Sequence, residues 1–390
     1  MTVLRLKLAD FSIEKWKKRR KVNYFNEGKE DIFFMSKKLP KQAILKSRKD
    51  KLWNYIPLGL AKNKKGKVDI IGWYLNDQNY ADDCMETYPA TSMLITGGTG
   101  SGKSVAERCI LEHTASFPDK FQVVAVDCKR VEFLQDEVQK MCKAVITDQE
   151  ATADAAITLQ KLMMTRFKLM ETYQVNNVWK LEKREAVVPY FEIEGVGKLQ
   201  FDELFQIEQD LDENDRKYPK LKMLYPSGKQ PRVLTIQEIY EKLQEKTIKS
   251  VSIKGKVVTA KDIKEVTGVY HPKAVLFMID EFEEAQSGED YKAIDTIRSA
   301  IGSICRLGRA SGIHICIGCQ RANNKTISTD LWNNLGLRLL LGGFSEETSL
   351  FVFEKDISNK CKPEIKGRGF LGYGNTIAEI QIFEGKTTHF

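Results

Sequence analysis

One stretch of the chain has the residue types and the spacing to bind a nucleotide. Residues 93–104 read Met-Leu-Ile-Thr-Gly-Gly-Thr-Gly-Ser-Gly-Lys-Ser, a short apolar strand that runs into a complete G-x-x-x-x-G-K-S pattern. Glycines there let successive backbone N–H groups point at phosphate oxygens. In this pattern Lys103 reaches the β- and γ-phosphates of ATP, and the Ser104 hydroxyl binds Mg²⁺. The residues expected to surround the nucleotide are Gly97, Gly98, Thr99, Gly100, Ser101, Gly102, Lys103, Ser104 and Val105.

Two further apolar strands end in polar side chains of the kind that ATP hydrolysis needs. The strand expected at 274–279 is followed by Asp280 and Glu281. We expect Asp280 to hold the water shell of Mg²⁺ and Glu281 to orient or deprotonate the attacking water. The strand expected at 313–319 is followed by Gln320, whose amide can sense the γ-phosphate or, alternatively, cap a loop. Together with the glycine-rich loop, these residues predict a nucleotide hydrolase.

Three arginines are candidates for a role in trans. Arg306 and Arg309 lie on the helix expected before the 313–319 strand, and Arg338 begins a later strand. Oligomeric P-loop enzymes place an arginine of a neighbouring subunit against the γ-phosphate, where it stabilises the charge of the transition state. The sequence does not distinguish among the three, and each is alternatively a surface or interface charge.

Composition predicts a soluble globular protein with a sizeable core. The 390 residues are 42% hydrophobic and 29% charged, and no apolar run approaches the roughly 18 residues of a membrane span. The eight cysteines are scattered, which is typical of a reduced, cytoplasmic compartment. Residues 1–70 carry 20 Lys/Arg against 7 Asp/Glu. This basic segment, with Lys and Arg crowded at 15–21, can contact a phosphate backbone, or it is a solvated helix face or a flexible arm.

The pattern along the chain divides it into two parts. Residues 1–90 predict a basic, strand-rich N-terminal module, with strand-like pieces at 32–35 and 68–73. Residues 91–390 predict an α/β domain, because apolar strands alternate with helices and this order favours a parallel sheet covered on both faces. Residues 180–272 interrupt the order as a polar insertion with short elements of its own. The expected core elements are strands at 93–96, 122–126, 144–147, 274–279, 313–319 and 337–342 and a long helix at 149–173.

These motifs together resemble the motor of the FtsK/SpoIIIE DNA translocases, within the FtsK–HerA group of P-loop ATPases. Residues 126–133 (Val-Asp-Cys-Lys-Arg-Val-Glu-Phe) are similar to the Asp-Pro-Lys-x-x-Glu segment of that family, with Cys128 at the proline position. The resemblance covers about 91–180 and 273–385. The other segments that carry it are 56–59, 94–105, 145–148, 166–170, 175–177, 279–282, 309–314, 319–321 and 367–370.

The resemblance implies a RecA-like motor that uses ATP and Mg²⁺ to move double-stranded DNA through a ring of subunits, expected to be a hexamer. Pore-facing loops of the family follow the acidic strand end and the sensor glutamine, here about 284–292 and 321–331. The first loop is acidic at 286–290, so any grip on phosphates there depends on Lys292. The residues expected to contact DNA are Lys292, Arg321, Asn323, Asn324 and Lys325.

Other motors of similar architecture remain as alternatives. One is a viral or plasmid enzyme that pumps DNA into a capsid or through a conjugation pore, with a portal or pore as partner and the host cytoplasm as location if viral. A second is a protein-secretion ATPase, which a peptide would stimulate. A third is a non-catalytic assembly protein switched by nucleotide; the full set of Lys103, Asp280, Glu281 and Gln320 argues against it.

Overall fold

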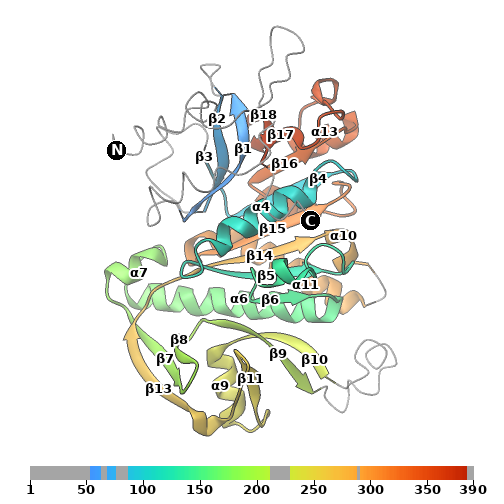
Figure 1. Ribbon diagram of the computed structural model, residues 1–390. Coiled ribbons are helices and arrows are strands. Elements are labelled where there is room, and N and C mark those ends of the chain that lie inside the picture. Colours follow the sequence, from blue (N-terminus) through green and yellow to red (C-terminus); the bar gives the residue numbers. More distant parts are fainter. Residues whose placement is uncertain (1–52, 63–67, 76–86, 211–228, 288–289, 384–390) are drawn as a thin grey trace. The chain divides into compact units, whose positions relative to one another are not determined.

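The computed structural model describes residues 53–62, 68–75, 87–210, 229–287 and 290–383 (Figure 1). The strand expected at 32–35 and the basic run at 15–21 lie outside these residues. The chain forms two compact units, one made of residues 1–118 and 316–390 and the other of residues 119–315. Strand β15 (Ile313–Cys319) carries the chain from the second unit into the first.

The first unit is built on a sheet with the strand order β3-β2-β1-β18-β17-β16-β4. β16 and β4 are parallel, whereas β1, β18, β17 and β16 are joined by antiparallel pairings. The elements of this unit are β1 (Tyr55–Lys62), β2 (Val68–Tyr74), β3 (Thr87–Pro89), β4 (Ser92–Gly97), α4 (Lys103–Ala115), α12 (Thr329–Asn334), β16 (Leu337–Leu341), α13 (Glu346–Phe353), η3 (Ser358–Lys360), β17 (Arg368–Tyr373) and β18 (Thr376–Ile382).

The N-terminal strands are part of this sheet. β1 pairs antiparallel with β18, the last described strand, in the register Gly59↔Ile382 and Ala61↔Ile380. A Cβ at Gly59 would lie 2.2 Å from the Gln381 carbonyl oxygen, so only glycine allows this approach of the two strands. The compact unit therefore extends across the boundary predicted near residue 90, and that boundary stays a prediction.

The second unit contains a parallel sheet and two long helices that pack against each other, α6 and α11 (Figure 1). Its strands have the order β14-β5-β6 and are buried on both faces, which explains their nearly continuous apolar sequences. The elements are β5 (Phe121–Asp127), α5 (Asp136–Gln139), β6 (Ala144–Ile146), α6 (Gln149–Thr172), α7 (Trp179–Lys183), β14 (Ala274–Asp280), α10 (Phe282–Ala285) and α11 (Tyr291–Ser311). The six expected core strands and the long helix are thus present, within two residues at each end.

The described residues between α7 and β14 (187–210 and 229–269) form small sheets and an amphipathic helix. β13, β7 and β8 make an antiparallel sheet, and β9 pairs with β10. The helix α9 begins with a capping box, in which Thr235 and Glu238 bond reciprocally to each other's backbone N–H groups. The elements are β7 (Val187–Ile193), β8 (Gly197–Gln200), β9 (Leu204–Asp210), β10 (Lys229–Thr235), α9 (Ile236–Gln244), β11 (Val251–Ile253), β12 (Lys256–Val258), η2 (Ala260–Asp262) and β13 (Ile263–Val269).

A buried ion pair ties this segment to the helices. Arg166, on α6, is fully buried and donates to Asp202 Oδ2 at 2.7 Å, to the Ser311 carbonyl at 2.7 Å and to the Lys273 carbonyl at 2.9 Å. Tyr270 donates its hydroxyl to the same Asp202 oxygen at 2.6 Å. Burial raises the pKa of Tyr270 well above its usual value, so the phenol stays protonated and remains a donor.

We expect Tyr270→Phe to lower the free energy of unfolding by about 1.5–3 kcal/mol, because the Asp202 carboxylate would lose a buried hydrogen bond. Chemical denaturation of the two proteins checks this value. Tyr240→Phe is the matched control, since Tyr240 contacts Phe191 through its ring in the same segment. Equal stability losses in both variants would contradict the role given to the Tyr270 hydroxyl.

Candidate nucleotide site

The glycine-rich loop connects β4 to α4 in the first unit. All six residues of β4 are buried, whereas Gly98, Thr99 and Gly100 are exposed at the tip of the loop. No atom of the described residues lies within 4 Å of a Cβ built at Gly98 or Gly100, so in this part of the structure the space beside the loop is open to a ligand. Gly102 precedes α4 with φ 107°, a left-handed conformation that favours glycine. The loop therefore has the shape and the exposed backbone that a phosphate chain requires.

A turn at Gly367, between η3 and β17, forms hydrogen bonds that hold the glycine-rich loop. Gly367, at φ 76°, donates its N–H to the Ser101 carbonyl at 3.1 Å and accepts from Ile382 N–H at 2.9 Å. A Cβ at Gly102 would lie 3.2 Å from the Cα of Gly367, so the two glycines allow this close approach. The 367–370 segment thus holds the glycine-rich loop, called the nucleotide loop below, in place. From sequence, this segment was only a match to a family motif.

The side chains of the loop suit an anionic ligand. Lys103 is 8% exposed, and its Nζ lies 3.8 Å from Glu107 Oε1. Within the described residues, the hydroxyl oxygens of Thr96 and Ser101 are buried without a hydrogen-bond partner. A buried cation, unpaired hydroxyls and open glycine backbone together fit the phosphates of ATP. Ser104, the expected Mg²⁺ ligand, and Val105 are partly exposed in the first turn of α4.

The acidic strand end lies in the second unit. Asp280 and Glu281 are only 3% and 6% exposed. Glu281 stands immediately before α10 with φ 52°, an unusual backbone conformation for a glutamate and one that is often found at functional sites. Lys129 Nζ lies 3.4 Å from Glu281 Oε2 and 3.9 Å from Glu284 Oε1. Glu281 is therefore a buried carboxylate with a fixed position and a cationic neighbour.

A loop after β5 brings Lys129 to this carboxylate. Asp127 is the register partner of Asp280 on the adjacent strand, and its Oδ2 accepts the N–H groups of Glu132 and Phe133, both at 2.8 Å. These two bonds fold residues 128–133 into a tight loop. Sequence analysis missed the roles of Asp127 and Lys129, although both fall in a segment that carried the family resemblance. Burial raises the pKa of the Cys128 thiol in the same loop to about 12, so it stays neutral.

Gln320 and the loop after it belong to the first unit. Gln320 and Arg321 are exposed directly after β15, and Asn324 and Lys325 are exposed a few residues further on. Asn323 has a different role, because its Oδ1 accepts the N–H groups of Lys325 and Thr326 at 2.9 and 3.1 Å and so shapes the loop. In the second unit, Lys292 is exposed in the first turn of α11.

The three candidate arginines lie in different surroundings. Arg338 donates to the carbonyls of Leu335, Trp332 and Val352 at 3.0–3.2 Å, and its guanidinium lies 3.7 Å from the centre of the Trp332 ring. These contacts hold Arg338 against other residues of its own chain. Arg306 is exposed and Arg309 partly exposed on α11. These two arginines have the better access to a neighbouring molecule, and the role in trans stays a prediction.

Comparison with known proteins settles the family. The FtsK/SpoIIIE family matches residues 76–324, more than half of the chain. This protein belongs to the FtsK/SpoIIIE family. Curated relatives include "DNA translocase FtsK" of two Helicobacter pylori strains, each 33% identical over 89 residues. That match spans 22% of this chain and 10% of the relative. This FtsK/SpoIIIE protein therefore matches only about a tenth of the length of each curated relative.

The fold agrees with this assignment. The cytoplasmic domain of the Thermomonospora curvata Type VII secretion ATPase EccC is similar in structure, with a TM-score of 0.50 and 18% identity, over 85% of this chain and 29% of that chain. The expected fold class, a RecA-like P-loop ATPase with a mostly parallel sheet and a strand-rich N-terminal region, is confirmed. This member of the FtsK/SpoIIIE family is a P-loop ATPase. In the part of the chain that the structure describes, no helix combines the length and apolarity needed to cross a bilayer.

Proposed function

We propose that this ATPase moves double-stranded DNA as a ring-shaped oligomer, expected to be a hexamer. The observation that carries the proposal is the complete nucleotide loop in a chain of the FtsK/SpoIIIE family: an open glycine backbone, a buried Lys103 and two unpaired buried hydroxyls. The buried acidic strand end at Asp280 and Glu281 supports hydrolysis rather than binding alone.

Each side chain has a role within this proposal. Lys103 would bind the β- and γ-phosphates, and Ser104 and Asp280 would hold Mg²⁺, which would neutralise phosphate charge. Glu281 orients and deprotonates the attacking water, while Lys129 keeps its carboxylate in place at 3.4 Å. Gln320, at the end of β15, senses the γ-phosphate and passes the change to the exposed loop that begins at Arg321.

That arginine would act together with the other exposed polar side chains of its loop. Arg321, Asn324 and Lys325 are exposed and can bind phosphate oxygens without reading base sequence. Asn323 supports them by fixing the backbone of the loop. Arg306 and Arg309, exposed and partly exposed on α11, are the proposed sources of the arginine that reaches a neighbouring subunit's nucleotide.

We expect the double variant Arg321→Gln/Lys325→Gln to bind duplex DNA more weakly and with a smaller salt dependence. Each phosphate contact contributes about 0.9 to the slope of log affinity against log salt concentration, so two lost contacts lower it by about 1.8. Titrations at several salt concentrations measure this slope. Lys355→Gln/Lys360→Gln removes the same charge from exposed positions of the same unit and serves as the control. An unchanged slope in the loop variant would exclude that loop as a phosphate contact.

The direct test of the proposed function is the ATPase rate with and without linear duplex DNA, together with the mass of the protein in solution. Stimulation by duplex DNA in a ring-sized assembly supports the proposal, for a chromosome, conjugation or genome-packaging motor alike. Stimulation by a peptide but not by DNA would instead indicate a protein-secretion ATPase. Binding of ATP without multiple turnover would indicate a nucleotide-switched assembly protein.

A further inference from the structure

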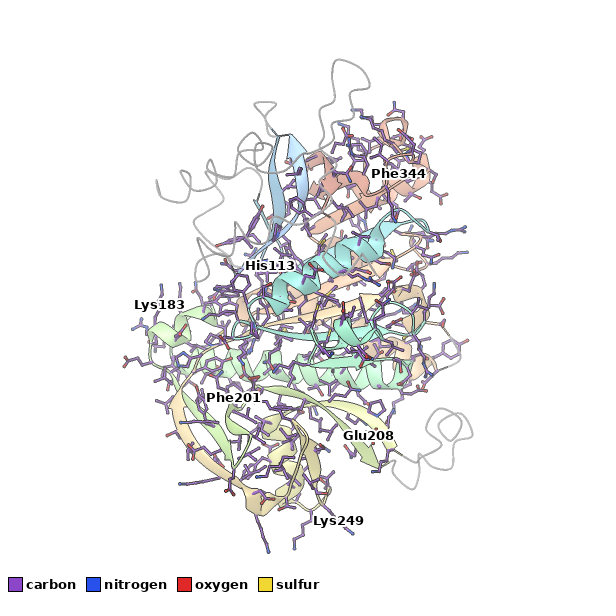
Figure 2. All side chains as sticks on the ribbon, in the orientation of Figure 1. His113, Lys183, Phe201, Glu208, Lys249 and Phe344 are labelled. Atoms are coloured by element: carbon purple, nitrogen blue, oxygen red, sulfur yellow. The ribbon has the colours of Figure 1, made fainter. Side chains whose placement is uncertain are left out.

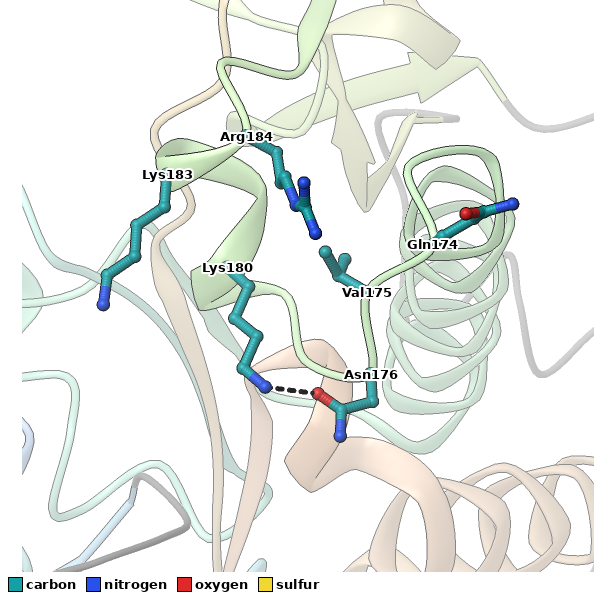
Figure 3. A pocket seen from close by; sticks show the side chains of 6 residues that line it. All are labelled: Gln174, Val175, Asn176, Lys180, Lys183 and Arg184. Atoms are coloured by element: carbon teal, nitrogen blue, oxygen red, sulfur yellow. Dashed lines mark hydrogen bonds between the residues drawn. The ribbon is translucent and has the colours of Figure 1, made fainter.

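A cationic pocket of about 810 Å³ lies where the chain leaves α6 and enters α7 (Figure 3). The side chains that line it include three positive charges and two amides. Among the residues that the structure describes, Val175 is the one apolar residue of the lining, and none of the lining residues is acidic. The lining residues are Gln174, Val175, Asn176, Lys180, Lys183 and Arg184.

The backbone around the pocket is firmly held. Val178 N–H donates to the Ala310 carbonyl at 2.8 Å, and Asn177 Oδ1 accepts the N–H of Trp179 at 2.9 Å. Val178 and Leu181 are fully buried, so α7 is anchored through its inner face. Because the backbone is fixed, the outward side chains of α7 present their charges from a defined platform, and the backbone needs little ordering when a ligand binds.

Two of the three positive charges lie on one face of this platform. Lys180 and Arg184 are four residues apart, and both extend toward the connecting segment that carries Val175 and Asn176 (Figure 3). Like charges at this spacing repel each other, and a bound anion would remove that repulsion. Lys180 Nζ donates to Asn176 Oδ1 at 2.8 Å, and the amide NH₂ of Asn176 points away from Lys180 (Figure 3).

The acidic residue within α7 does not neutralise this face. Glu182 pairs with His271 Nδ1 at 2.8 Å. Lys183 and Gln174 point away from the centre of the pocket and extend the polar surface on either side of it (Figure 3). The result is a broad surface of exposed N–H donors around a cationic centre, larger than a single small anion requires.

We propose that this pocket binds the phosphodiester backbone of duplex DNA, as a contact separate from the 284–292 and 321–331 loops. Lys, Arg, Asn and Gln are the side chains that hold phosphates without reading sequence, and they make up five of the six lining residues. A peptide site would need apolar pockets for anchoring side chains, and Val175 alone does not form one. The inference rests on the proposed function, because it assumes that duplex DNA is the substrate.

The test compares two triple variants of the same unit. Lys180→Gln/Lys183→Gln/Arg184→Gln changes the pocket, and the control Lys242→Gln/Lys246→Gln/Lys249→Gln removes the same charge at the end of α9. Lys183 and Lys249 are labelled in Figure 2. Fluorescence anisotropy with a labelled duplex at several salt concentrations gives the slope of log affinity against log salt. Loss of two or three phosphate contacts lowers the slope by about 1.8 to 2.7 in the pocket variant, while the control keeps the wild-type slope. Thermal unfolding verifies that both variants are folded. If the pocket variant is not folded, the single variants Lys180→Gln and Arg184→Gln replace it. Each is expected to lower the slope of log affinity against log salt by about 0.9.

The outcomes separate this inference from the proposed function. If the wild type binds duplex DNA and the pocket variant has the slope of the control, the pocket is not a DNA contact and the proposed function stands. If the wild type itself fails to bind duplex DNA, both proposals fall. If the pocket variant keeps the control's slope for the duplex but binds labelled polyglutamate more weakly than the control does, the pocket is a carboxylate site and the DNA assignment is wrong.

Discussion

Replacement of Lys103 by alanine is expected to lower ATP turnover by on the order of 10²- to 10³-fold, the usual loss when one preorganised electrostatic contact to the reacting group is removed. Lys103 is the first residue of α4 and is 8% exposed, so alanine removes a buried positive charge directly after the glycine-rich loop. The Glu107 carboxylate, 3.8 Å from the Lys103 ammonium, would then lose this cationic neighbour. Steady-state turnover and binding of a fluorescent ATP analogue measure the two losses.

Lys168→Ala is the matched control for this variant, because Lys168 is exposed on α6 and belongs to no part of the nucleotide loop. Its turnover should equal that of the wild type. Wild-type turnover in Lys103→Ala would exclude the glycine-rich loop as the place of hydrolysis.

The second large effect is expected at the acidic strand end. Glu281→Gln keeps the size of the side chain and removes the base, so turnover should fall by about 10²- to 10⁴-fold while ATP binding is retained. The variant should therefore accumulate with unhydrolysed ATP, and single-turnover kinetics with labelled ATP would show slow cleavage after normal binding.

Glu284→Gln provides a close comparison. Both carboxylates contact Lys129, at 3.4 and 3.9 Å, but only Glu281 is buried directly after β14. We expect turnover within a few-fold of the wild type for Glu284→Gln. Equal losses in the two variants would show that the ion pair with Lys129 matters, and that Glu281 is not the base.

Sequence alone was sufficient for the parts of the fold that depend on local patterns. The apolar runs that became β4, β5 and β14 are fully buried, and their limits agree with the structure within two residues. The glycine-rich loop could be found because its spacing follows directly from phosphate geometry. The same holds for Asp280 and Glu281, since acidic side chains directly after a buried strand are conspicuous in an otherwise apolar stretch.

Other features depend on contacts between residues far apart in the chain, which local patterns do not encode. The pairing of β1 with β18 joins Gly59 to Ile382, and the bond from Gly367 to Ser101 supports the nucleotide loop across a similar separation. The position of Lys129 beside Glu281 depends on the turn that Asp127 makes. Arg338, by sequence one of three candidates for a role in trans, donates three hydrogen bonds to carbonyls of its own unit.

The most direct test of the central claim is displacement of a third strand from a DNA triplex by the purified protein. A motor that steps along duplex DNA releases the labelled third strand when ATP and Mg²⁺ are present, and it releases none with a non-hydrolysable analogue or with Lys103→Ala. The account predicts release at a rate that follows ATP turnover. Continuous ATP hydrolysis on the triplex with the third strand still bound would contradict it.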